Sequence, residues 1–316
     1  KIKNLKVLIT GGTGFIGLSL IYVINILNIS LNTNISVDVL ARRKINFKNK
    51  LYFKINTNIN FIKHDLSQNK IKINKNYDCI IHLANNPNAN ENNSKTIIAC
   101  DENLINSFKN NVNKPSFILL SSGAIYDDKN NYPLKERSKK MSLKNKNITE
   151  YSRGKLASEK FLKINKSNFS KIIIFRGFTF IGFLKKFDNK FLINQIINKI
   201  VKNSKVDIKI NTDGSISRSF LYTIDAAIMI IMSIYKIKKG VFNLGSDEIF
   251  TIKKLDRKIN MDSKNNIKFL YLNKLKKPYS RNFYIPDISY LKNKLDYKTI
   301  VKLSKSISLV ANNYKN

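Results

Sequence analysis

The chain has 316 residues, long enough to bury a large core, and 43% of them are hydrophobic, as is usual for globular proteins. A net charge of +36 would suit a polyanionic partner, but the lysines are spread along the chain beside asparagine and isoleucine, which share A/T-rich codons with lysine. Because no arginine-rich arm and no basic cluster interleaved with aromatic residues occurs, we expect no nucleic-acid partner.

The first predicted strand, residues 6–10, runs into closely spaced glycines and then into a predicted helix over residues 14–27. Glycines allow a tight turn and bring backbone N–H groups close to phosphates, and a helix N-terminus adds partial positive charge. An ordinary glycine-rich turn is the alternative, but the flanking strand and helix favour a dinucleotide site. The predicted contacts are Gly11, Gly14, Phe15, Ile16 and Gly17.

The second predicted strand, residues 36–40, indicates which dinucleotide binds. NAD sites place an acidic residue at the end of this strand for the ribose hydroxyl, whereas NADP sites use arginine. Asp38 has the expected spacing from the glycines, but it lies inside the strand, and Arg42 and Arg43 follow the strand's end. We therefore predict NADP, bound by these two arginines, with NAD as the alternative.

Further strands and helices alternate along the first half of the chain, which predicts a doubly wound parallel α/β sheet. Asp101 and Glu102 are predicted to open a helix, where they would favour its dipole. His82, in mid-strand, is predicted to be a packed core residue. The predicted strands are 59–62, 79–83, 117–121, 171–175 and 241–244, the predicted helices 101–111 and 152–164, and the predicted loops 28–35, 67–76, 85–95 and 127–148.

Three polar residues indicate chemistry. Tyr151 and Lys155 are four residues apart, so on a helix they share one face. An ammonium group near a phenol lowers its pKa, which suits proton transfer, although a surface pair on a helix would show the same spacing. Ser122 follows a predicted buried strand, where such sheets bind ligands, although a serine in a turn would look the same.

Together, these elements resemble the extended short-chain dehydrogenase/reductase family, most closely its sugar-nucleotide epimerases, dehydratases and reductases, over nearly the whole chain. The resemblance implies that Ser122, Tyr151 and Lys155 are catalytic. It adds an adenine-contacting turn and a strand along the cofactor to the expected dinucleotide site, and it implies a substrate site. The cofactor contacts it adds are Asp65, Leu66, Leu83, Ala84, Asn103, Tyr151 and Lys155, with His64 beside the adenine, and the substrate contacts are Ser122, Thr179 and Arg218.

The chain departs from the family in two places. Gly123 and Ala124 stand where the 4,6-dehydratases carry an Asp-Glu acid pair, so we do not expect a dehydratase. Thr179 and Ile181 replace the family's Asn and Tyr in the segment that begins at Arg176, which puts the substrate contacts of this segment in doubt.

The resemblance implies a Rossmann domain of residues 1–175 plus 220–245, with a smaller C-terminal α+β substrate domain of residues 176–219 plus 246–316. The implied reaction is hydride transfer at a sugar carbon, C4 above all, of a nucleotide-diphosphate sugar. An epimerase and a 4-keto-reductase both remain open. A non-catalytic dinucleotide-binding sensor or an RNA-binding member of the same fold is the alternative from another class.

Two cysteines, Cys79 and Cys100, make neither a disulfide framework nor a metal site. The longest apolar stretches, 18–27 and 226–235, are about half the length of a membrane span, so we expect no membrane partner. No signal peptide is evident before the first strand, and we expect a cytoplasmic protein, compatible with a homodimer.

Overall fold

A computed structural model shows a seven-stranded sheet, built from strands within residues 6–177 and completed by β11 from the second half of the chain, ordered β11-β6-β5-β4-β1-β2-β3 with every neighbouring pair parallel. Its strands are β1 (Lys6–Thr10), β2 (Ser36–Ala41), β3 (Ile59–Lys63), β4 (Cys79–His82), β5 (Ser116–Ser122), β6 (Lys171–Gly177) and β11 (Gly240–Leu244). The residues that the structure describes are 3–45, 57–84, 93–127, 129–145, 148–182, 192–202, 207–262, 267–272, 283–299 and 301–315.

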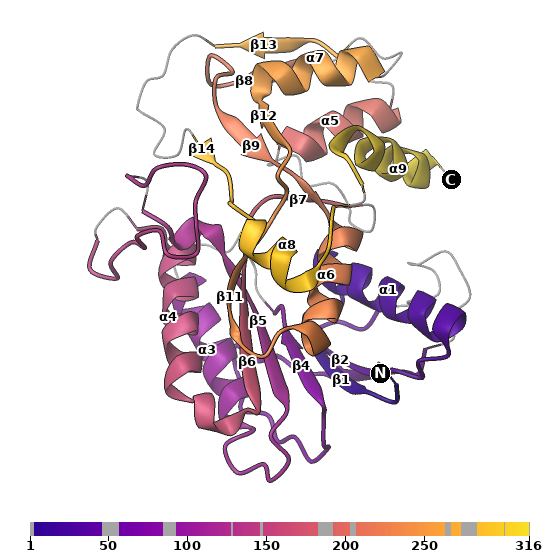
Figure 1. Ribbon diagram of the computed structural model, residues 1–316, viewed down its shortest axis with the longest axis vertical. Helices are drawn as coiled ribbons and strands as arrows, with labels where there is room; N and C mark the ends of the chain where they lie inside the picture. Colours follow the sequence, from indigo (N-terminus) through magenta and orange to yellow (C-terminus); the bar gives the residue numbers. More distant parts are fainter. Residues whose placement is uncertain are drawn as a thin grey trace.

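Helices cover both faces of this sheet, as Figure 1 shows. Helices α1 (Phe15–Leu31) and α6 (Thr223–Lys236) pack on one face, and α3 (Asn93–Asn106) and α4 (Glu150–Ile164) on the other. Successive strand residues point to opposite faces, so Ile81 joins the α1/α6 core while Ile80 joins the α3/α4 core. The predicted doubly wound α/β fold is confirmed.

The second half of the chain builds a separate core, at the top of Figure 1. Elements α6, β11 and α8 (Ser289–Leu295) of this half belong to the sheet instead, and Leu291 and Leu295 of α8 pack into the α1/α6 core. The elements around the separate core are β7 (Phe180–Ile181), α5 (Leu192–Lys202), β8 (Ile208–Ile210), β9 (Ser217–Ser219), β10 (Leu221–Tyr222), β12 (Ile249–Thr251), α7 (Ile252–Asp262), β13 (Phe269–Tyr271), β14 (Phe283–Tyr284) and α9 (Leu303–Lys315).

The main difference from the sequence prediction is the position of α3. The helix expected at 101–111 begins at Asn93 and ends at Asn106, so Asp101 and Glu102 lie in its middle and do not open it. Packing against α4 explains the early start, because Ser94 and Ile97 fit closely against Gly154. Of the loop expected at 85–95, residues 85–92 lie outside the described residues.

Helix α1 also runs further than expected, to Leu31, where Asn32 ends it in a left-handed conformation with φ of 49°. Within the described part of the chain, no helix combines the length and the apolar character that crossing a membrane requires.

Candidate active site

A large cavity of about 1250 Å³ opens at the carboxyl ends of the sheet strands and extends to the second core. Ordinary small-molecule sites measure roughly 300–1,000 Å³, so this cavity has room for two ligands side by side. The residues expected from the sequence that line it are Gly11, Gly14, Phe15, Ile16, Gly17, Arg42, Arg43, His64, Asp65, Leu66, Leu83, Ala84, Ser122, Tyr151, Lys155, Thr179 and Arg218.

The glycine-rich turn forms a backbone cradle. Gly11 has φ of +69°, and a Cβ atom there would lie 2.9 Å from the Ala84 backbone. A Cβ atom on Gly17 would lie 2.5 Å from the Gly12 Cα atom, so α1 starts directly against the turn. No side chain caps α1 and no acidic residue occupies its first turn, which leaves the helix N-terminus suited to an anion. The cradle therefore fits a pyrophosphate.

The end of β2 carries positive charge. Asp38 does not line the cavity, because its carboxylate accepts hydrogen bonds from Lys75 Nζ at 2.9 Å and from the Tyr77 hydroxyl at 2.6 Å. Arg42 and Arg43 are exposed and line the cavity. The two arginines therefore place positive charge on the cavity wall directly after β2.

The turn after β3 supplies the neighbouring wall. Asp65 accepts hydrogen bonds from the Ser67 N–H at 2.9 Å and the Ser67 hydroxyl at 2.6 Å. Burial alone would raise the pKa of Asp65, but these hydrogen bonds and the nearby Arg42 charge lower it. Asn103 does not line the cavity; its amide donates to the Leu66 carbonyl at 2.7 Å and supports the turn from behind.

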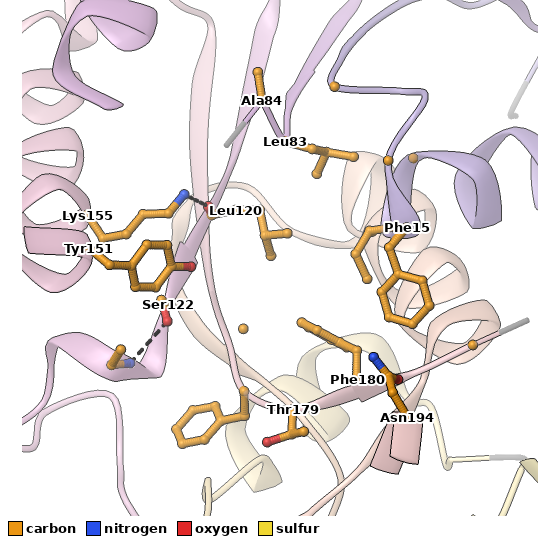
Figure 2. A pocket seen from close by; sticks show the side chains of 18 of the residues that line it. Phe15, Leu83, Ala84, Leu120, Ser122, Tyr151, Lys155, Thr179, Phe180 and Asn194 are labelled. Atoms are coloured by element: carbon orange, nitrogen blue, oxygen red, sulfur yellow. Dashed lines mark hydrogen bonds between the residues drawn. The ribbon is translucent and has the colours of Figure 1, made fainter. Parts of the chain in front are cut away.

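The three expected catalytic residues meet where β5 ends against α4. Figure 2 shows Ser122, Tyr151 and Lys155 together on one wall, with Phe15 across the cavity. Ser122 Oγ accepts a hydrogen bond from the Ala124 N–H at 3.1 Å and is also hydrogen-bonded to Tyr151. The first turn of α4 is fixed because the Ser152 hydroxyl donates to the Ala124 carbonyl at 2.8 Å.

The pKa of Tyr151 differs from the sequence expectation. Burial raises it to about 12, although the Ser122 hydrogen bond lowers it. Lys155 does not depress it, because its Nζ atom donates to the Leu120 carbonyl at 2.6 Å. Burial in turn lowers the pKa of Lys155 to about 8. In this arrangement Tyr151 is therefore a neutral phenol at neutral pH, and the expected lowering of its pKa by Lys155 stays a prediction.

The opposite wall comes from the second half of the chain. Arg218 lies in β9, the central strand of a three-stranded sheet, and its Nη1 atom donates to the Ser217 carbonyl at 2.8 Å. Tyr284 packs against Phe178 with ring centroids 4.6 Å apart and ring planes tilted by 35°, and its phenol group further raises the pKa of Tyr151. No sequence motif pointed to Tyr284, which is distant along the chain from all of them.

Buried polar groups behind the wall that carries Ser122, Tyr151 and Lys155, called the catalytic wall below, were also missed. Arg176 forms a bidentate ion pair with Glu159, with N–O distances of 2.9 and 2.8 Å, and the Ser121 hydroxyl donates to the same carboxylate at 2.8 Å. Ser121 precedes Ser122, and Glu159 follows Lys155 by one helical turn, so this ion pair ties the two parts of the catalytic wall together. The sequence analysis named Arg176 only as the start of a family segment, and the spacing of Glu159 from Lys155, which places both on one helix face, was the signal that could have found the pair.

His82 is buried, as expected, and is also hydrogen-bonded at both ring nitrogens. Its Nδ1 atom lies 2.6 Å from Thr10 Oγ1, and its Nε2 atom lies 2.7 Å from Asp101 Oδ1. This histidine therefore links the end of β1 to α3.

The sequence profile of the NAD-dependent epimerase/dehydratase family matches residues 7–245. No curated protein matches the chain in sequence. Similar solved structures include a UDP-N-acetylglucosamine 4-epimerase from Methanobrevibacter ruminantium M1 in complex with UDP-N-acetylmuramic acid, with 24% identity and a TM-score of 0.80 over 99% of this chain and 98% of that one.

Two further structures agree in fold. A UDP-glucose-4-epimerase from Stenotrophomonas maltophila, with bound NAD and formylated UDP-arabinopyranose, has 15% identity and a TM-score of 0.81 over 99% of this chain and 98% of that one. A UDP-glucuronic acid 4-epimerase from Bacillus cereus, in complex with UDP-glucuronic acid and NAD, has 20% identity and a TM-score of 0.78 over 98% of this chain and 99% of that one.

Proposed function

This chain belongs to the NAD-dependent epimerase/dehydratase family, and on that premise we propose that it epimerises a nucleotide-diphosphate sugar at C4. The observation that carries the proposal is the meeting of Ser122, Tyr151 and Lys155 on one wall of a cavity whose floor is the glycine cradle. An intact set of proton-transferring groups favours a catalyst over a non-catalytic sensor. The UDP-sugar 4-epimerases among structures of the same fold support the choice of substrate class.

When bound, the nicotinamide ring supplies a hydride acceptor and donor for the sugar carbon. With Tyr151 ionised, the sugar hydroxyl gives its proton to the Tyr151 oxygen as the carbon loses hydride, which leaves a ketone. Return of the hydride to the opposite face of the carbon, and of the proton to its oxygen, gives the epimer with no net redox change. Ser122 Oγ, next to the phenol, would hydrogen-bond the reacting oxygen, and turning the Lys155 ammonium from Leu120 toward Tyr151 would lower the phenol's pKa.

Arg218 is the proposed ligand of the sugar nucleotide's diphosphate. Its guanidinium offers donors in a planar fork that suits phosphate oxygens. It lines the cavity from β9, whereas the glycine cradle lies between β1 and α1, so the two diphosphate groups would have separate sites.

For the cofactor, we propose NADP, held by Arg42 and Arg43. Asp38, the acidic residue that could bind an NAD ribose, is engaged by Lys75 and Tyr77. Calorimetry should therefore show tighter binding of NADP than of NAD, and the double variant Arg42→Ala/Arg43→Ala should lose most of that preference. A wild-type preference for NAD, the dinucleotide in two of the structures above, would reject the proposal.

The test of the reaction is incubation with a fully hydroxylated UDP-sugar and no added cofactor. We expect two sugar nucleotides to interconvert without net absorbance change at the reduced-nicotinamide band, and chromatography would monitor the interconversion. A 4-keto-reductase is the second candidate, favoured by the two cavity-lining arginines if NADPH exchanges freely. It would instead consume NADPH in proportion to an added 4-keto sugar nucleotide.

A third outcome would reject both reactions. Absence of turnover, together with tight RNA binding at physiological salt, would favour a non-catalytic role for this basic chain.

A further inference from the structure

Asp101 is a buried carboxylate with both oxygens engaged. The structure places it in mid-helix on α3, 3% exposed, with Oδ1 2.7 Å from His82 Nε2 and Oδ2 hydrogen-bonded by the Ser158 hydroxyl. The histidine is in turn held by Thr10 Oγ1, which also accepts a hydrogen bond from the Ala84 N–H at 3.2 Å. Asp101 is therefore fixed from β1, β4 and α4 together.

Lys155 is a buried cation on α4, the helix that also carries Ser158. It is 4% exposed, and Ser158, which holds Asp101, lies three residues further along α4. A buried ammonium is costly unless an anion compensates its charge. The hydrogen bond from Nζ to the Leu120 carbonyl supplies a dipole but no countercharge.

Burial lowers the pKa of Lys155, and among the described residues Asp101, Glu159 and Cys100 counteract this lowering. Burial raises the pKa of the Cys100 thiol to about 12, so this group is neutral at neutral pH. Glu159 is already neutralised by its bidentate pair with Arg176. Asp101 is left as the carboxylate whose charge no guanidinium compensates.

We propose that Asp101 is a positioning residue of the catalytic wall: it is the buried counter-ion that keeps the Lys155 side chain charged, and His82 and Ser158 hold it in place. The consequence for turnover rests on the proposed function, but the effect on Lys155 does not. Tyr151, on the same helix, is the other titratable side chain of this wall, and it is neutral at neutral pH.

The direct test is the pH dependence of Lys155 acetylation by acetic anhydride, a small reagent that can enter the cavity. The full-length protein is acetylated and then digested, and mass spectrometry of the peptides measures the modification of Lys155. Because only the neutral amine reacts, the wild-type rate should rise with a midpoint at about pH 8, the pKa of Lys155. Asp101→Asn keeps the size and hydrogen-bonding groups but removes the charge. We expect it to move the midpoint down by roughly one pH unit.

Three further variants sharpen the test. Asp38→Asn removes a carboxylate that lies outside the cavity and should leave the midpoint unchanged. Asp101→Glu should restore most of the wild-type value. If Asp101→Asn does not fold, as judged by thermal melting, Asp101→Ser removes the same charge with a smaller side chain and should give the same shift.

An unchanged midpoint in the neutral Asp101 variants would overturn the proposal, and so would a larger shift in Glu159→Gln than in Asp101→Asn. In the epimerase assay, Asp101→Asn should move the alkaline limb of the kcat/KM profile to lower pH, because less of Lys155 is charged there. Absence of turnover in the wild type would count against the proposed function alone, since acetylation reports on Lys155 without catalysis.

Discussion

Burial sets the pKa values of Tyr151 and Lys155, the two titratable side chains on the wall that also carries Ser122. Tyr151 is a neutral phenol, since its pKa is about 12, and Lys155 titrates close to physiological pH, since its pKa is about 8. Tyr151 can therefore give a proton to a ketone oxygen without any prior change. Accepting a proton from a sugar hydroxyl requires a cation to turn toward the phenol, and Lys155 is the cation on the same helix face.

Replacement of Tyr151 by phenylalanine should lower kcat at least about 100-fold, the usual contribution of a positioned acid or base. The ring stays, so dinucleotide affinity measured by calorimetry should be nearly unchanged. Tyr290→Phe, at a tyrosine that is 46% exposed, is the matched control and should turn over at the wild-type rate. Activity of Tyr151→Phe within a few-fold of wild type would remove Tyr151 from the mechanism.

The Arg176–Glu159 pair should contribute strongly to stability. Arg176→Met leaves the Glu159 carboxylate buried without a partner, and breaking such a pair costs about 3–5 kcal/mol of the free energy of unfolding. The double variant Arg176→Met/Glu159→Gln should lose less than the sum of the two single losses. Urea denaturation at pH 7 measures both. A loss below about 1 kcal/mol in Arg176→Met would contradict the expectation.

The same pair predicts a pH dependence. Burial by itself would raise the pKa of Glu159, but the hydrogen bonds and charge of Arg176 outweigh burial and lower it. A carboxylate with a lowered folded-state pKa contributes stability above its ordinary value of 4.5, and this contribution is lost as pH falls below that value. The stability gap between wild type and the double variant should therefore shrink in acid.

At the scale of elements, the contact between α3 and α4 positions the catalytic wall. Gly154 lets the helices approach, and hydrogen bonds from Ser94 to Glu150 and from Ser158 to Asp101 join them. The sequence predicted α4 well because its apolar spacing is regular. It misplaced α3 because the helix begins in an asparagine-rich stretch of low intrinsic propensity, where packing against α4 decides the structure.

The sign of the change in unfolding free energy that Gly154→Ala causes tests this contact. At a solvent-exposed position inside a helix, alanine in place of glycine stabilises the fold by about 1 kcal/mol. Here the new Cβ would lie 2.7 Å from Ile97 Cδ1 and 3.1 Å from the Ser94 Cα atom. We expect a loss of about 1–3 kcal/mol in urea denaturation and a lower kcat, since Tyr151 and Lys155 flank the site.

The control is Lys160→Ala, at an exposed position of the same helix, which should change stability by less than about 0.5 kcal/mol. Stabilisation by Gly154→Ala would show that the two helices can separate without cost.

At the scale of the whole molecule, the cavity lies between two hydrophobic cores. We propose that residues 1–175 plus 220–245 form the dinucleotide-binding unit and residues 176–219 plus 246–316 the substrate unit, with α8 packed on the sheet side. The first unit was predictable because its strands and glycine turn carry local signatures. The second was not, because its short strands pair segments far apart in sequence, such as β9 with β12 and β14.

This arrangement predicts that the two ligands depend on different halves of the chain. Arg218→Ala should weaken UDP-sugar binding by about 2–5 kcal/mol if the guanidinium holds a desolvated diphosphate. Dinucleotide binding should barely change, because the glycine cradle belongs to the other core. Calorimetric titration with each ligand measures both, and Arg137→Ala, an exposed arginine outside the cavity lining, serves as the control. Equal loss of both ligands in Arg218→Ala would indicate a shared site or misfolding, and the separation of the two sites would be wrong.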